Sequence, residues 1–179
     1  MAYQDLPTGR DVPNVINLVI EIQRGGGRNK YELDKDTGLL TLDRVNGTTA
    51  AYPADYGYVP GTLCEDGDPL DALLLIDEPV VHGAVVPARP IGVLYMVDDG
   101  EGDEKLVCVP AEDISKKHLN DLADLSDQGA NFKKVVEHFY THYKDWKNDW
   151  QGVKVEFRGW GNAEDAKKVV QDSVAHAQK

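Results

Sequence analysis

Residues 65–74 read Glu-Asp-Gly-Asp-Pro-Leu-Asp-Ala-Leu-Leu, and they place Asp66, Asp68 and Asp71 in a tight turn directly before an apolar run that extends to Ile76. Packing does not require this arrangement, because carboxylates crowded within six residues repel one another unless water or cations separate them. Ionised carboxylates are hard oxygen ligands, so the stretch predicts a site for Mg²⁺ or Mn²⁺, with Ca²⁺ as an alternative. The competing interpretation is a solvated Asp/Gly/Pro turn that caps a strand.

An EF-hand loop also begins with Asp-x-Asp, but its pattern does not fit this stretch. Counted from Asp66, Asp71 stands where the loop needs glycine, and Asp77 stands where a bidentate glutamate is required. The three carboxylates are therefore better interpreted as side chains that converge from a turn and from the first residue of a buried strand.

The length indicates a single globular domain, and the cysteines indicate a protein whose thiols stay reduced. The chain has 179 residues, which is enough for a single domain with a sizeable core, residues 1–179. Cys64 and Cys108 fit neither a disulfide framework nor a CxxC metal pattern, and a reducing cytoplasm suits them. Residues 1–12 lack the apolar segment of a secretion signal, and no later apolar run has the length of a membrane span. We therefore expect a soluble cytoplasmic protein.

The charge excludes some partner classes. The formal net charge is −12, whereas a nucleic-acid or anionic-membrane surface needs a basic face that releases counterions or attracts lipid headgroups. We therefore expect no nucleic acid and no membrane among the partners.

Periodicity and turn signals predict many short strands followed by helices. Strands are expected at residues 15–23, 30–33, 39–45, 106–109 and 153–160, and strand-like runs broken by Gly83, Pro87 and Pro90 cover residues 80–96. Helices are expected near residues 114–125, at 132–143, and from a capping box of Asn162 and Asp165 to about residue 177. Gly25–Gly27 and Asn46-Gly47 are typical of hairpin connections. The pattern predicts a small β-barrel with helices on one side.

Acidic and basic side chains recur at positions from which they could face one another. The candidate carboxylates are Glu21, Glu32, Asp66, Asp68, Asp71, Asp98 and Asp103, and the candidate cations are Lys30, Arg44, Lys105 and Lys144. Seven negative and four positive charges leave a local charge of −3, which two or more Mg²⁺ ions would reverse, so that a phosphate polyanion could bind. This composition favours metal-assisted phosphoryl transfer to water. No Ser, Cys or His nucleophile with a base partner is apparent, which favours direct attack by water over a covalent intermediate.

Several short sequence blocks, which occur in the same order along the chain, resemble those of the soluble family I inorganic pyrophosphatases of the prokaryotic type. The blocks, from about Val15 to the C-terminus, are Asp66-Gly67-Asp68-Pro69-Leu70-Asp71, Val19-Ile20-Glu21-Ile22, Lys30-Tyr31-Glu32, Asp43-Arg44, Tyr52-Pro53, Tyr56-Gly57-Tyr58, Asp98 to Lys105 and His142-Tyr143-Lys144. The resemblance implies hydrolysis of pyrophosphate to two orthophosphates with several Mg²⁺ ions, for which Mn²⁺ can substitute. It also implies a mainly β fold, a distorted five-stranded OB-like closed barrel with flanking α-helices, and a homohexamer.

The resemblance assigns roles by matched position. The principal metal ligands would be Asp66, Asp71 and Asp103, with Asp98 and Glu32 serving additional ions and Glu21 supporting the metal set. Asp68 would orient or deprotonate the attacking water. The phosphates would be contacted by Lys30, Arg44, Tyr56, Tyr143 and Lys144, with Lys105 and Tyr52 as supporting residues. The chief departure from the family pattern is the connection from Gln23 to Asn29, with its three glycines.

Two other functions would use some of the same residues. A nucleic-acid-binding OB module would stack bases on Tyr52, Tyr56 and Tyr58, but the net charge and the neighbouring carboxylates oppose it. A non-catalytic Ca²⁺-binding protein would explain the acids but not the four basic residues interleaved with them.

Overall fold

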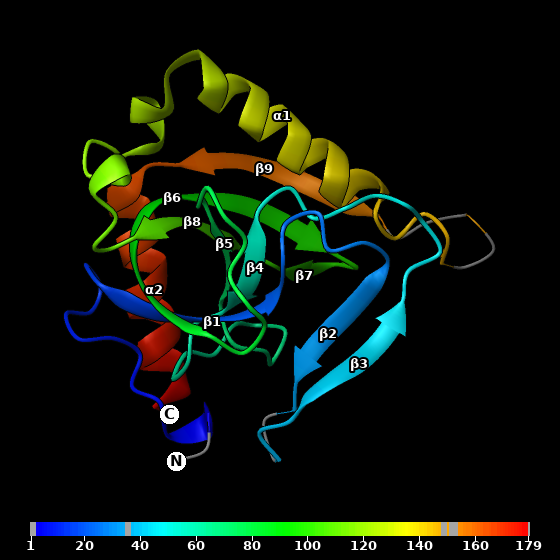
Figure 1. Cartoon of the computed structure of the whole chain (residues 1–179), viewed down its shortest axis with the longest axis horizontal. Coiled ribbons are helices and arrows are strands. Elements are labelled where there is room, and N and C mark those ends of the chain that lie inside the picture. The colour runs from blue at the N-terminus through cyan, green and yellow to red at the C-terminus, as the bar shows by residue number, and fades with distance from the viewer. Residues whose placement is uncertain (1–2, 35–36, 148–149, 151–153, 179) are drawn as a thin grey trace.

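The computed structural model of the chain describes residues 3–34, 37–147, 150 and 154–178. The strands are β1 (Ile16–Ile22), β2 (Asn29–Leu33), β3 (Leu40–Val45), β4 (Asp55–Tyr58), β5 (Asp71–Leu74), β6 (Val85–Asp98), β7 (Glu101–Gly102), β8 (Lys105–Pro110) and β9 (Val155–Gly161). The helices are η1 (Tyr3–Asp5), η2 (Ile114–Lys116), η3 (Leu122–Leu125), α1 (Ser126–His142) and α2 (Ala163–Ala177). Figure 1 shows a curved sheet with α1 and α2 beside it and the β2–β3 hairpin standing away from it.

Five strands close into a ring in the described part of the chain. β1 pairs antiparallel with β4 and β6, β4 pairs with β5, and β6 pairs with β8. A parallel pair, β5 with β8, completes the ring, and β7 and β9 both extend it from β6. Bulges interrupt β1 between Ile20 and Ile22 and β6 between Pro90 and Gly92, so the ring is not a regular barrel. The expected fold class, a distorted five-stranded barrel with flanking helices, is confirmed.

The alternation along residues 16–22 predicts one apolar face and one more polar face, whereas the core uses both faces of β1. Ile16, Leu18 and Ile20 are fully buried with Val170 of α2, as their alternation predicts. On the opposite face, Val19 is also fully buried. It packs under the hairpin, and Glu21 on the same face is buried too. The first strand therefore joins the core of the ring to the base of the hairpin.

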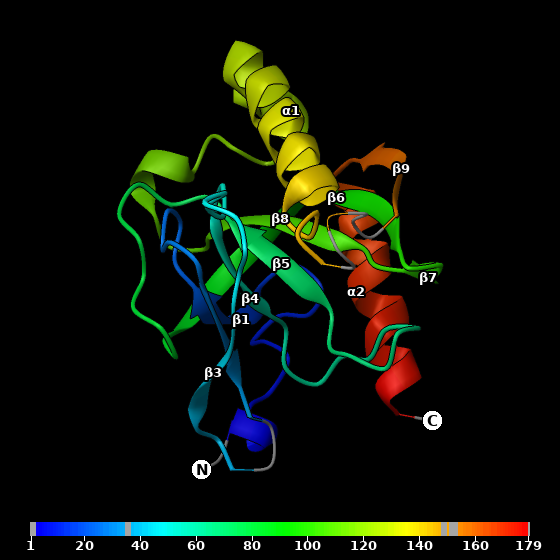
Figure 2. The ribbon, with the colours of Figure 1, turned by 90° about the vertical axis from the view of Figure 1, so that its right-hand side faces the viewer.

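The hairpin connections expected at two glycine-containing segments are wrong. The strands that flank Gly25–Gly27 are not paired with each other, because β1 pairs with β4 and β6 while β2 pairs with β3. Asn46-Gly47 follows β3, but β3 is paired with β2 alone among the described strands, and the next strand, β4, belongs to the ring. Turn residues permit a reversal of the chain, but packing of the strand faces decides which strands pair. Figure 2 shows the resulting hairpin extending away from the ring.

Three further boundaries differ from expectation. Of the runs expected over residues 80–96, residues 85–96 lie in one strand, β6, whose register against β8 is irregular after Pro90, and residues 80–84 precede the strand. The helix expected near residues 114–125 is replaced by η2 and η3, whose N-caps are the side chains of Asp113 and Asp121. Helix α1 begins at Ser126, earlier than its apolar stripe indicated. None of the described helices is long and apolar enough to cross a membrane.

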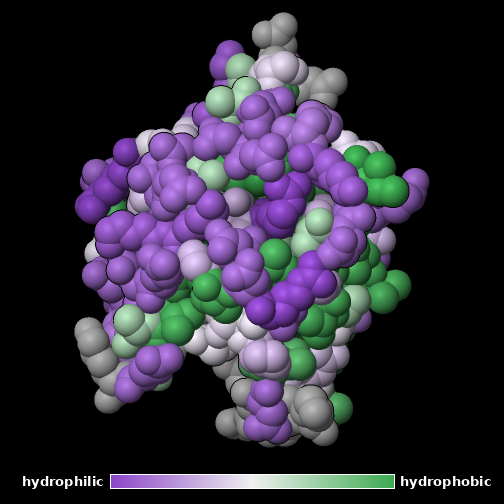
Figure 3. All heavy atoms as spheres, turned by 90° about the vertical axis from the view of Figure 1, so that its left-hand side faces the viewer, coloured by the Kyte–Doolittle hydropathy of each residue, from purple (hydrophilic) through white to green (hydrophobic). Residues whose placement is uncertain are grey.

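One face of the surface is mostly hydrophilic. Figure 3 shows this face, with apolar atoms exposed between the hydrophilic residues. Such scattered apolar atoms are ordinary on a folded domain.

The capping box of α2 is confirmed and gives a stability prediction. The Asn162 side chain accepts a hydrogen bond from the Asp165 N–H at 3.0 Å, and the Asp165 carboxylate accepts one from the Asn162 N–H at 2.9 Å. Because Asn162→Ala removes the acceptor, we expect it to destabilise the protein by about 1 kcal/mol, which lowers Tm by about 2–4 °C at this chain length. Thermal denaturation measures the change. Gln171→Ala, on the exposed face of α2, is the control, and an equal Tm in both variants would contradict the capping role.

Candidate active site

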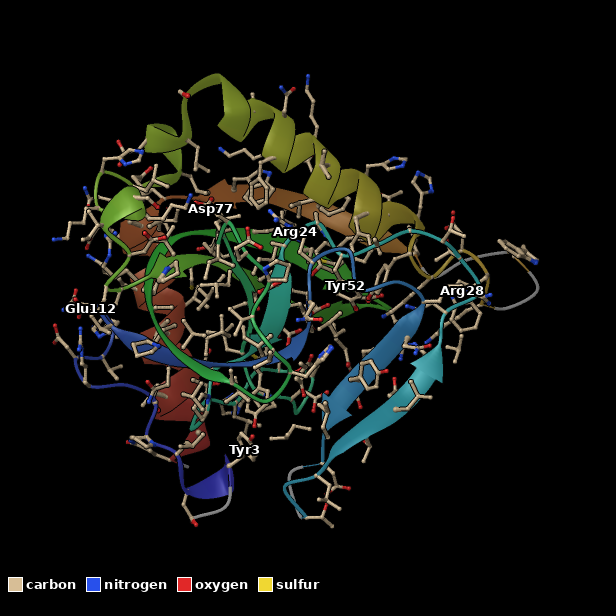
Figure 4. All side chains as sticks on the ribbon, viewed as in Figure 1. Tyr3, Arg24, Arg28, Tyr52, Asp77 and Glu112 are labelled. Carbon is tan, nitrogen blue, oxygen red and sulfur yellow. The ribbon has the colours of Figure 1, made fainter. Side chains whose placement is uncertain are left out.

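One cavity of about 370 Å³ lies where the ring, the hairpin and the C-terminal end of α1 meet. All fourteen site residues predicted from the sequence line it, namely Glu21, Lys30, Glu32, Arg44, Tyr52, Tyr56, Asp66, Asp68, Asp71, Asp98, Asp103, Lys105, Tyr143 and Lys144. Figure 4 shows Tyr52 in this region, between the ring and the hairpin. The structure thus brings the predicted residues together, while their individual roles stay predictions.

The acidic turn is held by its own backbone. The Asp66 side chain accepts a hydrogen bond from the Asp68 N–H at 2.9 Å, and the Asp68 carbonyl accepts one from the Cys64 N–H at 2.8 Å. Gly67 has a φ of +84°, a conformation that glycine adopts without strain. Leu70, next to the turn, is fully buried. These contacts fix Asp66 and Asp68 at the rim, and β5 then begins with Asp71.

Lys105 joins the two acidic loops at the bottom of the cavity. The parallel β5–β8 pair places it in register with Asp71, and its Nζ lies 2.5 Å from Asp71 Oδ2 while also donating a hydrogen bond to Asp103 Oδ1. The rings of Tyr56 and Tyr140 lie 5.9 and 5.7 Å from the same Nζ. Burial alone would lower the pKa of Lys105, but Asp71 and Asp103 hold it well above its usual value. The ammonium group therefore stays charged, with the partners that a buried ion needs.

Burial and like charge both act on the carboxylates. Burial raises the pKa of Asp66, and the charges of Asp103, Asp68 and Asp71 raise it further. Burial raises the pKa of Asp103 as well; Lys105 opposes this effect, and Asp71 adds to it. These like charges act on one another because the two acidic loops meet at Lys105.

Among the cavity carboxylates with a raised pKa, Glu21 is the most deeply buried. Burial raises that pKa to about 7, although a hydrogen bond from the Leu33 N–H opposes the shift. The carboxylate receives this bond at 2.7 Å, so it also attaches the hairpin to β1.

Basic groups approach from the other two walls. From the hairpin, Lys30 pairs with Glu32 and lies 3.4 Å from Asp43, which also accepts a hydrogen bond from Arg44 at 2.8 Å. Lys30 and Glu32 are two residues apart on β2, so their side chains share one face of the strand. Each cation is therefore held by a neighbouring carboxylate instead of extending freely into solvent.

The end of α1 brings a cation and a phenol onto Asp98. Lys144 forms an ion pair with Asp98 Oδ2, and the Tyr143 hydroxyl lies 3.4 Å from the same oxygen. The other oxygen, Oδ1, is buried and has no hydrogen-bond partner among the described residues. A buried carboxylate oxygen without a donor is a ready ligand for a cation.

The residues fit a hard divalent cation by their chemistry. The cavity supplies oxygen ligands, and the unpartnered oxygen of Asp98 needs a positively charged or donating partner. Within the described residues, however, no three His, Cys, Asp or Glu side chains already converge around one point. The Lys105 ammonium lies between Asp71 and Asp103 instead. The assignment of Asp66, Asp71 and Asp103 as principal ligands therefore stays a prediction.

Some lining residues were not among the predicted site residues. They are Leu33, Tyr58, Pro69, Asp99, Glu101 and Tyr140. Asp99 and Glu101 belong to the acidic loop before Lys105, so the loop gave a signal for them. Tyr140 lies on α1, and its ring also packs in the core. Among the described lining residues, nine acids face four bases, a local charge of −5 where the sequence indicated −3.

The sequence matches the family model described as inorganic pyrophosphatase over residues 18–178. The chain belongs to the inorganic pyrophosphatase family. A Pseudomonas aeruginosa protein named inorganic pyrophosphatase is 44% identical over 180 residues, which cover 100% of each chain. The crystal structure of inorganic pyrophosphatase from Thermus thermophilus superposes with a TM-score of 0.91 at 38% identity, covering 100% of each chain. A Helicobacter pylori inorganic pyrophosphatase gives 0.86 at 39% identity, covering 98% of this chain and 99% of that one.

The crowding of carboxylates predicts that Mg²⁺ stabilises the protein. One site at a free Mg²⁺ concentration of about 100 times its Kd adds roughly 2.7 kcal/mol, which raises Tm by roughly 5–10 °C at this chain length. Asp71→Asn should lose most of this increment, because it removes a charge at the point where the two acidic loops meet. Thermal denaturation with and without Mg²⁺ measures the increment directly, without an activity assay.

The matched control is Asp172→Asn, which changes an acid that pairs with Lys168 at the exposed surface of α2. This variant should keep the full Mg²⁺ increment. Equal increments in Asp71→Asn and the wild type would show that the turn is only a solvated cap.

Proposed function

We propose that this protein is an inorganic diphosphatase that hydrolyses pyrophosphate to two orthophosphates by direct attack of water, without a covalent intermediate. The observation that carries the proposal is that two acidic loops and four basic side chains line one cavity, in a chain of the inorganic pyrophosphatase family. A site of mixed charge can take a phosphate polyanion once cations offset the carboxylates.

Several Mg²⁺ ions would be held by Asp66, Asp71 and Asp103, with Asp98, Glu32 and Glu21 completing the set, and Mn²⁺ would serve as a substitute. Bound divalent ions lower the pKa of water and offset the negative charge of phosphate oxygens.

Asp68 is the residue that we assign to the attacking water. Its backbone is fixed by the hydrogen bonds from Cys64 and to Asp66, so its carboxylate projects from a rigid turn at the cavity rim. As general base, Asp68 accepts a proton while the water oxygen bonds to phosphorus. The phosphoanhydride P–O bond breaks, and the bridging oxygen leaves with the second phosphate.

The phosphate groups would be bound by Lys30 and Arg44 from the hairpin and by Tyr56, Tyr143 and Lys144 from the opposite walls. Burial raises the pKa of both tyrosines well above the usual value, so each stays neutral at physiological pH and can donate a hydrogen bond to a phosphate oxygen. The cations take up the charge that develops on the leaving phosphate. Lys105 would keep the two acidic loops together, and Tyr52 would support the site.

The family resemblance also supports three broader proposals. The protein works as one domain over residues 1–179, it assembles as a homohexamer, and it acts in the cytoplasm, where its two free cysteines stay reduced.

The first test is the reaction itself. With Mg²⁺, the protein should release orthophosphate from pyrophosphate and show little activity on phosphomonoesters, because the walls of the cavity offer cations for two phosphate groups. Phosphate release is measured with each substrate, and EDTA should abolish it. Full activity in the chelator, or equal rates on a monoester, would refute the assignment.

The second test concerns Asp68. Asp68→Asn keeps the shape of the side chain but removes the base, so kcat should fall by roughly 10²–10⁴ while Mg²⁺ affinity changes little. Initial rates across a Mg²⁺ titration separate the two effects. Asp172→Asn is again the control for an acid-to-amide change. If the loss lies mainly in Mg²⁺ affinity, the base is another residue.

A further inference from the structure

The β2–β3 hairpin carries Lys30, Glu32 and Arg44 into the cavity, yet it is a separate two-stranded sheet. None of the described strands of the ring pairs with it. Nearly every side chain of β3 is exposed, and Figure 1 shows the hairpin beside the ring and not within it. A two-stranded sheet is marginally stable by itself. The position of its cations therefore depends on the few contacts that attach it to the rest of the molecule.

One attachment lies at the end of the hairpin remote from Arg44. Leu33 is 3% exposed and packs against Val19 and Tyr58. Its N–H also donates the hydrogen bond to Glu21. This contact fixes the Leu33 end of the hairpin to β1 and β4, but it leaves the position of the Arg44 end to other contacts.

A second attachment begins at Asn46, directly after β3. Its side chain is buried, with the residue 3% exposed, and its Oδ1 accepts a hydrogen bond from Arg44 Nε at 3.3 Å. The Asn46 N–H donates to the Arg28 carbonyl, and Arg28 Nε donates to the Asn46 carbonyl, both at 2.7 Å. Figure 4 shows Arg28 at this end of the hairpin. The buried amide thus orients Arg44 and ties the two strands together.

The next residue, Gly47, lies directly against the indole of Trp146. A Cβ at position 47 would lie 2.6 Å from Trp146 Cγ and 2.8 Å from its Cδ2, so a larger residue cannot fit there without movement of the ring. Trp146 Nε1 in turn donates a hydrogen bond to the Tyr143 carbonyl at 3.0 Å. The indole therefore bridges the Arg44 end of the hairpin and the segment that carries Tyr143 and Lys144.

We propose that Trp146 is a positioning residue, which packs on Gly47 and holds Arg44 at a fixed distance from Tyr143 and Lys144. This inference rests on the proposed function, in which these residues bind the same phosphate-bearing substrate. The Asn46-Gly47 dipeptide, which resembles a hairpin turn in the sequence, serves here as the docking point for the indole.

The electrostatics of the neighbouring residues explain why an anchor is needed. Burial lowers the pKa of Lys147, next to Trp146, and the charges of Arg44, Lys144 and Lys30 lower it further. The basic groups of the two segments thus lie close enough to repel one another. Asp43 and Asp98, which pair with these cations, offset part of the repulsion, and the packing of Trp146 on Gly47 adds a contact that holds the two segments together.

The test compares truncation with conservative replacement. Trp146→Ala should raise KM for pyrophosphate on the order of tenfold and change kcat much less, because it displaces binding groups without removing any of them. Trp146→Phe keeps an aromatic ring on Gly47 and should restore most of the affinity. Gly47→Ala, which adds one methyl group beneath the indole, should raise KM in the same direction. If Trp146→Ala does not fold, Gly47→Ala and Trp146→Phe decide the question.

The control is Trp160→Ala, a truncation of equal size on β9, where the indole packs near Phe132 and bonds to Glu137. This variant should lower Tm and leave KM unchanged. If Trp146→Ala also lowers Tm and leaves KM unchanged, Trp146 has only a structural role and the inference is overturned.

Hydrogen exchange tests the anchor without reference to catalysis. In Trp146→Ala, the amides of β2 and β3 should exchange faster than in the wild type, while those of β8 in the core should keep their protection. Unchanged exchange in the hairpin would overturn the anchor. If the wild-type protein does not hydrolyse pyrophosphate, the proposed function fails, and the exchange result alone still decides whether Trp146 holds the hairpin.

Discussion

The site depends on the ion pairs that the buried ammonium group of Lys105 forms with Asp71 and Asp103. Two carboxylates from different loops could not lie so close without a positive charge between them. The parallel β5–β8 pair supplies that charge, because its register places Lys105 opposite Asp71. Loss of one member would leave a buried charge without its partner, which costs far more than the pair contributes. The same β5–β8 pairing therefore closes the ring and sets the geometry of the acidic cavity.

Local signals in the sequence predicted local structure well. The alternation of Ile16, Leu18 and Ile20 gave the inner face of β1, and the Asn162–Asp165 spacing gave the start of α2. Both patterns act within a few residues, where periodicity and hydrogen bonding are decided by neighbours. The membership of the cavity was predicted in a different way. The acidic turn at residues 66–71 indicated a metal site, and the family resemblance supplied the grouping of residues that lie far apart in the sequence.

Pairing between distant segments could not be predicted in the same way. Asn46-Gly47 has the composition of a two-residue hairpin turn, but the strand that follows it pairs in the ring, and the dipeptide instead receives the indole of Trp146. Val19 shares its face of β1 with the polar residues Asn17 and Glu21. It is nevertheless buried, because the hairpin covers it. In both cases the strand pairing or the burial depends on a surface contributed by residues far away in the sequence. Local strand and turn propensities carry no information about such a surface.

The charged side chains of the cavity are attached to the molecule in two different ways. The acids of residues 66–71 and 98–103 lie on or beside strands of the ring, whose backbone hydrogen bonds and buried side chains fix them. Lys30 and Arg44 lie on the hairpin, whose contacts with the ring are few. Local stability is lowest where buried apolar contacts are fewest. The geometry of these loop carboxylates is thus a property of the core, whereas the geometry of Lys30 and Arg44 depends on individual anchoring side chains. Residues outside the cavity can therefore change substrate affinity without changing the chemistry.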